Sequence, residues 1–279
     1  MGENSIVALE TMTILTQDRI DEMNTQGLWP RGLLLDRVDR WAEEKPDAVA
    51  INGLNSMRGR TESVSYSQLR RYARRIAIGL ADLGVEKGEV VSFQMPNWWE
   101  FAALHLACLH IGAITNPVMP IFRQRELSFM LDYAETKVFI APKIFRNFDH
   151  QAMIEKLRPN LPQLEHIFIL GGEGDASFEA QFIDRRWEEE VDGDALFAER
   201  RPEPNDIIEL LYTSGTSGVP KGVLHTSNTL LSTVEAGRDR LGLTSDDVVF
   251  MPSPMAHQTG FLYGMVMAFI LGTKLVLQD

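Results

Sequence analysis

The residues best suited to chemistry lie in one short segment, residues 210–223, which reads LLYTSGTSGVPKGV. Its glycines permit positive φ and let the backbone approach a bound group, and its hydroxyl side chains lie beside free amide N–H groups. A triphosphate also requires a cation, which Lys221 supplies where apolar sequence resumes. The segment therefore predicts a phosphate-binding loop with the candidate residues Thr213, Ser214, Gly215, Thr216, Ser217, Gly218 and Lys221.

Spacing excludes two other loops of similar composition. A Walker phosphate loop needs Gly-Lys followed by Ser or Thr, but Lys221 follows Pro220 and precedes Gly222. A hydrolase nucleophile elbow needs one residue between its serine and its second glycine, and Ser217 adjoins Gly218 directly. A flexible Ser/Gly linker remains an alternative, although a linker has no reason to lie between two apolar strands and to carry one placed lysine.

The segment YTSGTSGVPKG at 212–222 resembles the signature phosphate loop of the acyl-adenylate-forming enzymes, which include acyl-CoA synthetases, peptide-synthetase adenylation domains and firefly luciferase. VSYSQL at 64–69 and LHIGAITNP at 109–117 resemble further segments of that superfamily. The resemblance implies ATP, Mg²⁺ and coenzyme A as cofactors and a two-step ligase reaction. A carboxylate attacks the α-phosphate of ATP to give acyl-AMP and pyrophosphate, and a thiol then displaces AMP. Thr213, Ser214 and Thr216 would hold the β- and γ-phosphates, and Lys221 would stabilise charge or help pyrophosphate to leave.

A second segment matches the family around His257. Pro254 and His257 fit the Pro-x-x-His pattern of acyl-CoA and aryl-CoA ligases, and the acid that amino-acid-activating relatives carry here is absent. The resemblance implies that His257, like Lys221, is catalytic, acting as a gate between the acyl site and the thiol tunnel. Without the motif, a lone histidine at a strand-to-helix junction is more often structural.

The helix after this histidine would line the acyl pocket. Gly260 and Gly264, one turn apart, would leave room for a chain or a ring, although close helix packing explains them as well. Trp98 and Trp99 have two interpretations of the same kind, a pocket wall or core packing. The predicted substrate pocket contains His257, Gln258, Thr259, Gly260 and Phe261.

The elements that position these residues alternate between strands and helices. Strand 207–212 leads into the loop, strand 223–225 returns from it, helix 226–241 follows, and strand 247–251 leads to the His257 segment. Upstream, strands at 90–95, 113–117, 137–141 and 165–170 alternate with helices at 98–111, 125–133 and 148–157. This rhythm predicts an α/β fold with mostly parallel sheets covered by helices.

Three parts of the chain are expected. Residues 1–30 form an N-terminal arm, residues 31–205 a first α/β subdomain, and residues 206–279 the phosphate-loop and acyl-pocket segment of a second, incomplete α/β subdomain. Superfamily members are about twice as long, and their adenine, ribose, hinge and catalytic-lysine motifs are not found here. The resemblance therefore implies an N-terminal fragment without the C-terminal half and the small lid domain, which is not expected to form acyl-AMP alone.

The composition is that of a globular protein, with 44% hydrophobic and 24% charged residues among 279. The formal charge of −12 argues against non-specific binding of nucleic acid. One basic cluster, Arg70, Arg71, Arg74 and Arg75, would form a solvated helix face or, alternatively, a binding patch.

The single cysteine, Cys108, excludes an intrachain disulfide and a thiolate metal cluster, and the histidines show no ligand spacing, so no metal-ligating residues are predicted. No signal peptide and no apolar run of about 18 residues are evident, which predicts a cytoplasmic protein without a membrane span.

The leading functional hypothesis is part of an AMP-forming carboxylate–CoA ligase. The QTG sequence after His257 and the closing VLQD resemble bacterial cyclohexanecarboxylate and medium-chain fatty acid ligases. An adenylating enzyme that passes its acyl group to a carrier protein is one alternative, and a non-catalytic nucleotide-binding remnant is another. Whether the protein is a homo-oligomer stays open.

Overall fold

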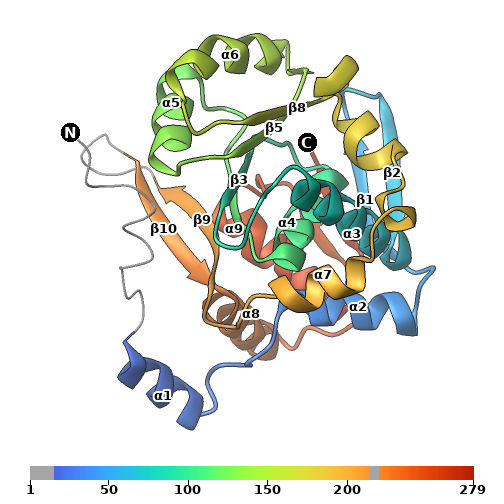
Figure 1. Ribbon diagram of the computed structural model, residues 1–279. Helices are drawn as coiled ribbons and strands as arrows, with labels where there is room; N and C mark the ends of the chain where they lie inside the picture. Colours follow the sequence, from blue (N-terminus) through green and yellow to red (C-terminus); the bar gives the residue numbers. More distant parts are fainter. Residues whose placement is uncertain (1–15, 214–219) are drawn as a thin grey trace.

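In the computed structural model, which describes residues 16–213 and 220–279, a six-stranded and a four-stranded sheet are surrounded by helices (Figure 1). Neighbouring strands are mostly parallel, and the predicted α/β fold class is confirmed. The helices that the structure describes are α1 (Gln17–Thr25), α2 (Leu34–Glu44), α3 (Tyr66–Asp82), α4 (Trp99–Ile111), α5 (Gln124–Tyr133), α6 (His150–Leu157), α7 (Gly193–Arg200), α8 (Ser227–Leu241), α9 (Gln258–Gly260) and α10 (Met267–Leu271), with shorter turns between them.

The six-stranded sheet has the order β10-β9-β4-β3-β5-β8. All neighbours are parallel except β9 and β10, which form an antiparallel hairpin. The parallel strands therefore end at one common edge. The strands are β3 (Val90–Phe93), β4 (Ile114–Pro117), β5 (Val138–Pro142), β8 (His166–Leu170), β9 (Ile207–Thr213) and β10 (Lys221–Thr226).

Both faces of the central parallel strands β3, β4 and β5 are buried, as parallel sheets require. Val138 and Ile140 of β5 pack into the core that contains α3 and α4. Phe139 and Ala141, which alternate with them, pack against α5 and α6. Helices therefore cover β5 on both sides, which explains why this strand is almost entirely apolar.

The four-stranded sheet joins distant parts of the chain in the order β11-β12-β1-β2. Its strands are β1 (Val49–Asn55), β2 (Arg60–Ser65), β11 (Val249–Met251) and β12 (Leu275–Gln278), and a small hairpin, β6 (Ile144–Phe145) with β7 (Phe148–Asp149), lies outside both larger sheets. The stretch from residue 206 onward thus supplies strands to both sheets, so position 205/206 does not coincide with a boundary between them. The division into an arm and two subdomains stays a prediction.

Local signals set the ends of the two central helices. Ser65 and Gln68 form the predicted capping box at the start of α3. Gly112 closes α4 in the left-handed conformation, at φ 66°. Cys108 lies buried within α4, and burial raises the pKa of its thiol to about 12, so this cysteine is a core residue.

The glycines and acids of the segment 171–194 predict a surface excursion with one short helix, and most of its residues are exposed. It folds into the turns η3 (Gly174–Ala176), η4 (Glu179–Asp184) and η5 (Trp187–Glu189), and it buries Phe182 and Trp187 against Gly79 of α3. Arg75 is only 8% exposed, and its Nε donates to Glu188 at 2.8 Å. The predicted solvated face of α3 is therefore wrong for Arg75, which anchors the acidic segment instead.

None of the helices within residues 16–213 and 220–279 combines the length and the apolar character needed to cross a bilayer. The same residues contain no group of three or more His, Cys, Asp or Glu side chains placed to hold a metal ion.

Candidate active site

The hairpin of β9 and β10 presents two of the predicted phosphate ligands. Lys221 and Thr213 are directly paired at its open end, and both are exposed. Ser214, Gly215, Thr216, Ser217 and Gly218 lie outside the described residues. The pairing therefore places one residue with a hydroxyl group and one with an ammonium group side by side at this end of the hairpin.

This end of the hairpin lies at the carboxyl edge of the parallel sheet. Thr213 ends β9, Phe93 ends β3 and Pro117 ends β4, and these strands run in the same direction. In open α/β sheets, ligands bind outside the carboxyl ends of the strands. The position of the hairpin thus agrees with a binding role.

His257 caps the short helix α9. Its ring Nδ1 accepts a hydrogen bond from the Thr259 backbone N–H at 3.2 Å. The backbone N–H of His257 donates to the Pro254 carbonyl at 3.0 Å. Because Nδ1 is an acceptor, the neutral ring carries its proton on Nε2. The ring is exposed, so it can meet a ligand.

Gln258 connects the turn that carries His257 to the hairpin of β9 and β10. Its amide Nε2 donates to Nε2 of His225 at 3.1 Å, and His225 lies on β10. Burial lowers the pKa of His225, which keeps the ring neutral and able to accept. Nδ1 of His225 then carries the proton and faces Thr229 Oγ1 at 3.4 Å. The structure therefore joins the hairpin and the residue after His257 by a direct contact.

The next residues of the predicted substrate pocket are differently placed. Thr259 is exposed, but Phe261 is fully buried, with its ring edge against His105 at a centroid distance of 4.9 Å. A Cβ on Gly260 would overlap the backbone of Pro254, and one on Gly264 would lie 2.6 Å from Met251 Cγ. In this structure, neighbouring atoms occupy the space beside both glycines. The role of these residues as a substrate pocket stays a prediction.

Asn97, which sequence reasoning did not assign to the site, holds the chain that leads to His257. Its amide Nδ2 donates to the carbonyls of Ser253 at 2.9 Å and Gln278 at 3.1 Å, and its Oδ1 accepts from the Met255 N–H at 2.7 Å. The neighbouring Trp98 is buried, as the core-packing alternative predicted.

Glu209 is the second residue that sequence reasoning missed. It lies on β9 between Thr115 of β4 and His225 of β10 and is fully buried. Neither carboxyl oxygen has a hydrogen-bond partner in the part of the chain that the structure describes. Burial raises the pKa of this carboxyl well above its usual range, so the folded protein holds it protonated. The sequence signal that could have identified Glu209 is a single acidic residue among the apolar residues of β9.

The contact between Gln258 and His225 can be tested by stability. Replacing Gln258 with methionine should lower the free energy of unfolding by about 1 kcal/mol, because His225 loses its donor within a half-buried site. Urea unfolding measures this difference. Gln151→Met, which removes an exposed helix-surface bond to Glu155, is the matched control and should change stability by less than about 0.5 kcal/mol. Equal effects of the two substitutions would contradict a structural role for the contact.

Comparison with protein-family models shows to which family the chain is related. The family model described as "AMP-binding enzyme" matches residues 38–279, which is most of the chain. The chain belongs to the AMP-binding enzyme family. The sequence resemblance to acyl-adenylate-forming enzymes is thereby confirmed.

Two curated members show how much of the family this chain represents. It is 35% identical over 257 residues to the medium-chain fatty-acid–CoA ligase of Escherichia coli K12, covering 91% of this chain and 43% of that enzyme. It is 28% identical over 258 residues to a Streptomyces salicylyl-CoA synthase / salicylate adenylyltransferase, covering 92% and 45%. The chain thus spans less than half the length of these AMP-binding enzymes.

Solved structures support the same fold. The apo structure of Mycobacterium smegmatis MbtA superposes with a TM-score of 0.77 at 24% identity, covering 98% of this chain and 48% of that one. An anthranilate CoA ligase, AuaEII, in complex with anthranoyl-AMP, superposes with a TM-score of 0.72 at 23% identity, covering 90% and 44%. At these identities the likeness shows the AMP-binding enzyme fold alone.

Proposed function

We propose that this chain provides the phosphate hairpin and part of the acyl-binding wall of an ATP-dependent, AMP-forming carboxylate–CoA ligase. The observation that carries the proposal is the hairpin contact: β10 bears Lys221 at the loop and His225 against Gln258, the residue after His257. A nucleotide phosphate at the loop and an organic acid near the histidine would then lie on the two sides of one connected structure.

The chain's own groups fit the first chemical step. Mg²⁺ enters with ATP as part of the substrate. Negative charge develops on phosphoryl oxygens as the carboxylate attacks, and a loop of N–H and hydroxyl donors with one lysine stabilises that charge without reorganising. Thr213 and Lys221, opposite each other at the hairpin end, would bind the β- and γ-phosphates. His257, which is exposed, would border the acid and gate the approach of the thiol.

The acid is proposed to be an uncharged-tail carboxylic acid of medium-chain or alicyclic type. The named activity of the Escherichia coli relative supports the medium-chain choice, and the absence of an acid near His257 in sequence argues against an amino-acid substrate. The adenylyltransferase name of the Streptomyces relative supports the alternative of another acyl acceptor.

The experiment measures ATP–pyrophosphate exchange and acyl-CoA formation by the whole protein that carries this chain, with a panel of carboxylic acids. Acid-dependent exchange followed by CoA-dependent acyl-CoA formation supports the ligase. Exchange with no acyl-CoA would assign the acyl group to a carrier protein instead. Absence of exchange with every acid would leave a non-catalytic nucleotide-binding remnant. The isolated 279-residue chain is expected to form no acyl-AMP, because its relatives are more than twice as long.

A substitution tests the hairpin end directly. Thr213→Val, which removes only the hydroxyl, should lower kcat/KM for ATP about 10-fold or more, because a hydrogen bond to a charged group contributes about 1.5–3 kcal/mol. Lys221→Ala should have a comparable effect that added salt reduces. Lys156→Ala on α6 removes an exposed lysine elsewhere and is the control. If Thr213→Val matches the unsubstituted protein, Thr213 does not bind phosphate.

A further inference from the structure

Asn97 lies in the turn between β3 and α4 and is only 4% exposed. Its side-chain amide joins two other parts of the chain. Nδ2 donates to the Ser253 carbonyl and to the Gln278 carbonyl of β12, and Oδ1 accepts from the Met255 N–H. The amide thus uses its two N–H groups and its oxygen together, as few side chains of this size can.

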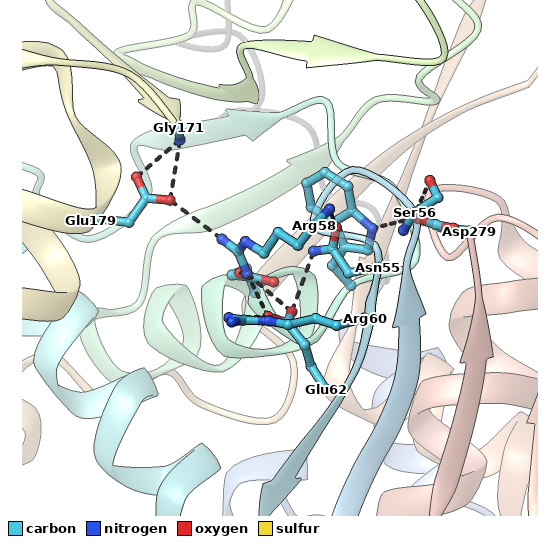
Figure 2. A network of polar contacts seen from close by, with 10 residues as sticks. Asn55, Ser56, Arg58, Arg60, Glu62, Gly171, Glu179 and Asp279 are labelled. Atoms are coloured by element: carbon cyan, nitrogen blue, oxygen red, sulfur yellow. Dashed lines mark hydrogen bonds and ion pairs between the residues drawn. The ribbon is translucent and has the colours of Figure 1, made fainter.

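The end of β12, to which the amide is bound, is itself firmly held. β12 pairs in parallel with β1 as far as Gln278. The next residue, Asp279, accepts at Oδ2 from the Ser56 N–H at 2.8 Å and from Ser56 Oγ at 3.0 Å, as Figure 2 shows, and from Trp98 Nε1 at 2.6 Å. The Gln278 carbonyl is therefore a fixed anchor for the Asn97 amide.

The segment on the other side of the amide cannot be fixed by strand pairing. β11 ends just before Pro252, and neither Pro252 nor Pro254 has an N–H with which a ladder could continue. Within the described part of the chain, the two bonds from Asn97 are the only side-chain hydrogen bonds to residues 252–256. The Met255 N–H is buried, and a buried donor without an acceptor is unfavourable. The position of this segment therefore depends on Asn97.

Two further hydrogen bonds link this segment to His257. The Pro254 carbonyl, which lies between the two residues that Asn97 contacts, accepts the backbone N–H of His257 at 3.0 Å. The His257 ring then caps α9 by accepting the Thr259 N–H at Nδ1. A displacement of residues 253–255 therefore moves the His257 ring.

We infer that Asn97 is a positioning residue for His257, because its amide ties the turn that carries the histidine to the end of β12. The catalytic consequence rests on the proposed ligase function, whereas the contacts do not depend on it. Thr213 and Lys221 are held separately, by the pairing of β9 with β10. Loss of the Asn97 amide should thus disturb the acid and thiol side of the site and spare the ATP side.

Asn97→Asp tests the amide, because it keeps the size of the side chain and the acceptor for the Met255 N–H but turns an oxygen toward two carbonyl groups. Asn160→Asp, the same change at an exposed position, is the matched control. In the 279-residue chain, hydrogen exchange followed by NMR should become about 10-fold or more faster at the Met255 and Thr259 amides in Asn97→Asp alone. The Phe139 amide, within the central sheet, should keep its rate.

Asn97→Ala removes the amide without placing an oxygen against the carbonyls, and it replaces Asn97→Asp in these measurements if the latter fails to fold. Unchanged exchange at Met255 and Thr259 would mean that the turn is held without Asn97. Equal acceleration at Phe139 would mean a general loss of stability. Either result would overturn the inference.

In the whole protein, ATP–pyrophosphate exchange with octanoate and formation of octanoyl-CoA separate the two sides of the site. Asn97→Asp should lower kcat/KM for octanoate about 10-fold or more, mainly through KM, and should change KM for ATP by less than about 2-fold. A merely structural role would lower kcat with the folded fraction and leave both KM values unchanged, which would contradict positioning. Because Asn97 acts through His257, Asn97→Asp should add less than about 2-fold in a His257→Ala background. A full further loss there would mean that Asn97 acts by another route.

The two kinds of measurement distinguish this inference from the proposed function. If the whole protein shows no exchange with any acid, the ligase proposal fails, and hydrogen exchange at Met255 and Thr259 still decides whether Asn97 positions the turn. If exchange activity is normal in the parent and in both Asn97 variants, the ligase proposal stands and the positioning role of Asn97 is refuted.

Discussion

Replacing Gly260 with alanine should lower the free energy of unfolding by about 3 kcal/mol or more. The added Cβ would overlap the Pro254 carbonyl oxygen and lie 2.7 Å from the Ser253 carbonyl oxygen. Both atoms are backbone, so no side-chain rotation relieves the overlap. The backbone conformation of Gly260, φ −69° and ψ −36°, is open to any residue, so the cost arises from contact alone.

The same substitution should also displace the histidine turn. The Pro254 carbonyl accepts the His257 N–H, so moving residues 253–254 moves the cap of α9. Thermal or urea unfolding measures stability, and the whole protein's acid-dependent ATP–pyrophosphate exchange measures the site.

Gly237→Ala is the matched control for this prediction. A Cβ on Gly237, within α8, would make ordinary contacts of 3.7 Å with Met267 and 3.8 Å with Tyr263. Alanine is a better helix former, so this variant should be as stable as the parent or more stable by about 0.5–1 kcal/mol. If Gly260→Ala is as stable to unfolding as Gly237→Ala, the backbone of residues 253–254 does not pack closely against Gly260.

The elements could be predicted from sequence because their signals are local. The Ser65–Gln68 capping box, the glycine after α4 and the apolar runs of the sheet each depend on a few neighbouring residues. The loop composition between 212 and 222 also predicted the hairpin that brings Thr213 opposite Lys221.

The contacts that connect the site could not be predicted in this way, because each joins residues far apart in sequence. Gln258 meets His225 across 33 positions, and Asn97 holds Met255 across 158. The segment 171–192 is a related case. Its acids are exposed, as residues of this type usually are, but Phe182 and Trp187 fill the space above Gly79, which only the packed structure shows.

Glu209 shows why burial matters for such residues. An acidic side chain in a strand is expected at the surface, but this one lies between two neighbouring strands and is fully buried. The polar atoms face no donor in the described chain, so the carboxyl stays neutral instead of forming an ion pair.

Glu209→Gln should therefore stabilise the protein, by an amount that grows with pH. The unfolded carboxyl releases its proton above its ordinary pKa of 4.5, whereas the folded carboxyl keeps it. Rising pH then favours the unfolded state of the parent by about 1.4 kcal/mol for each pH unit, until the folded group also ionises. The glutamine has nearly the same shape and binds no proton, so the penalty disappears in the variant.

Urea unfolding of the parent and of Glu209→Gln between pH 4 and pH 8 measures the difference. It should be near zero at pH 4 and increase steadily above pH 4.5. The buried histidines His105, His110 and His150 titrate in both proteins and cancel in the comparison. Glu155→Gln, on the surface, should give less than about 0.5 kcal/mol throughout. A difference that does not change with pH would mean that folding leaves the pKa of Glu209 unshifted. A variant that loses stability relative to the parent as the pH rises would mean that Glu209 is ionised in the folded protein and has a partner that stabilises its charge.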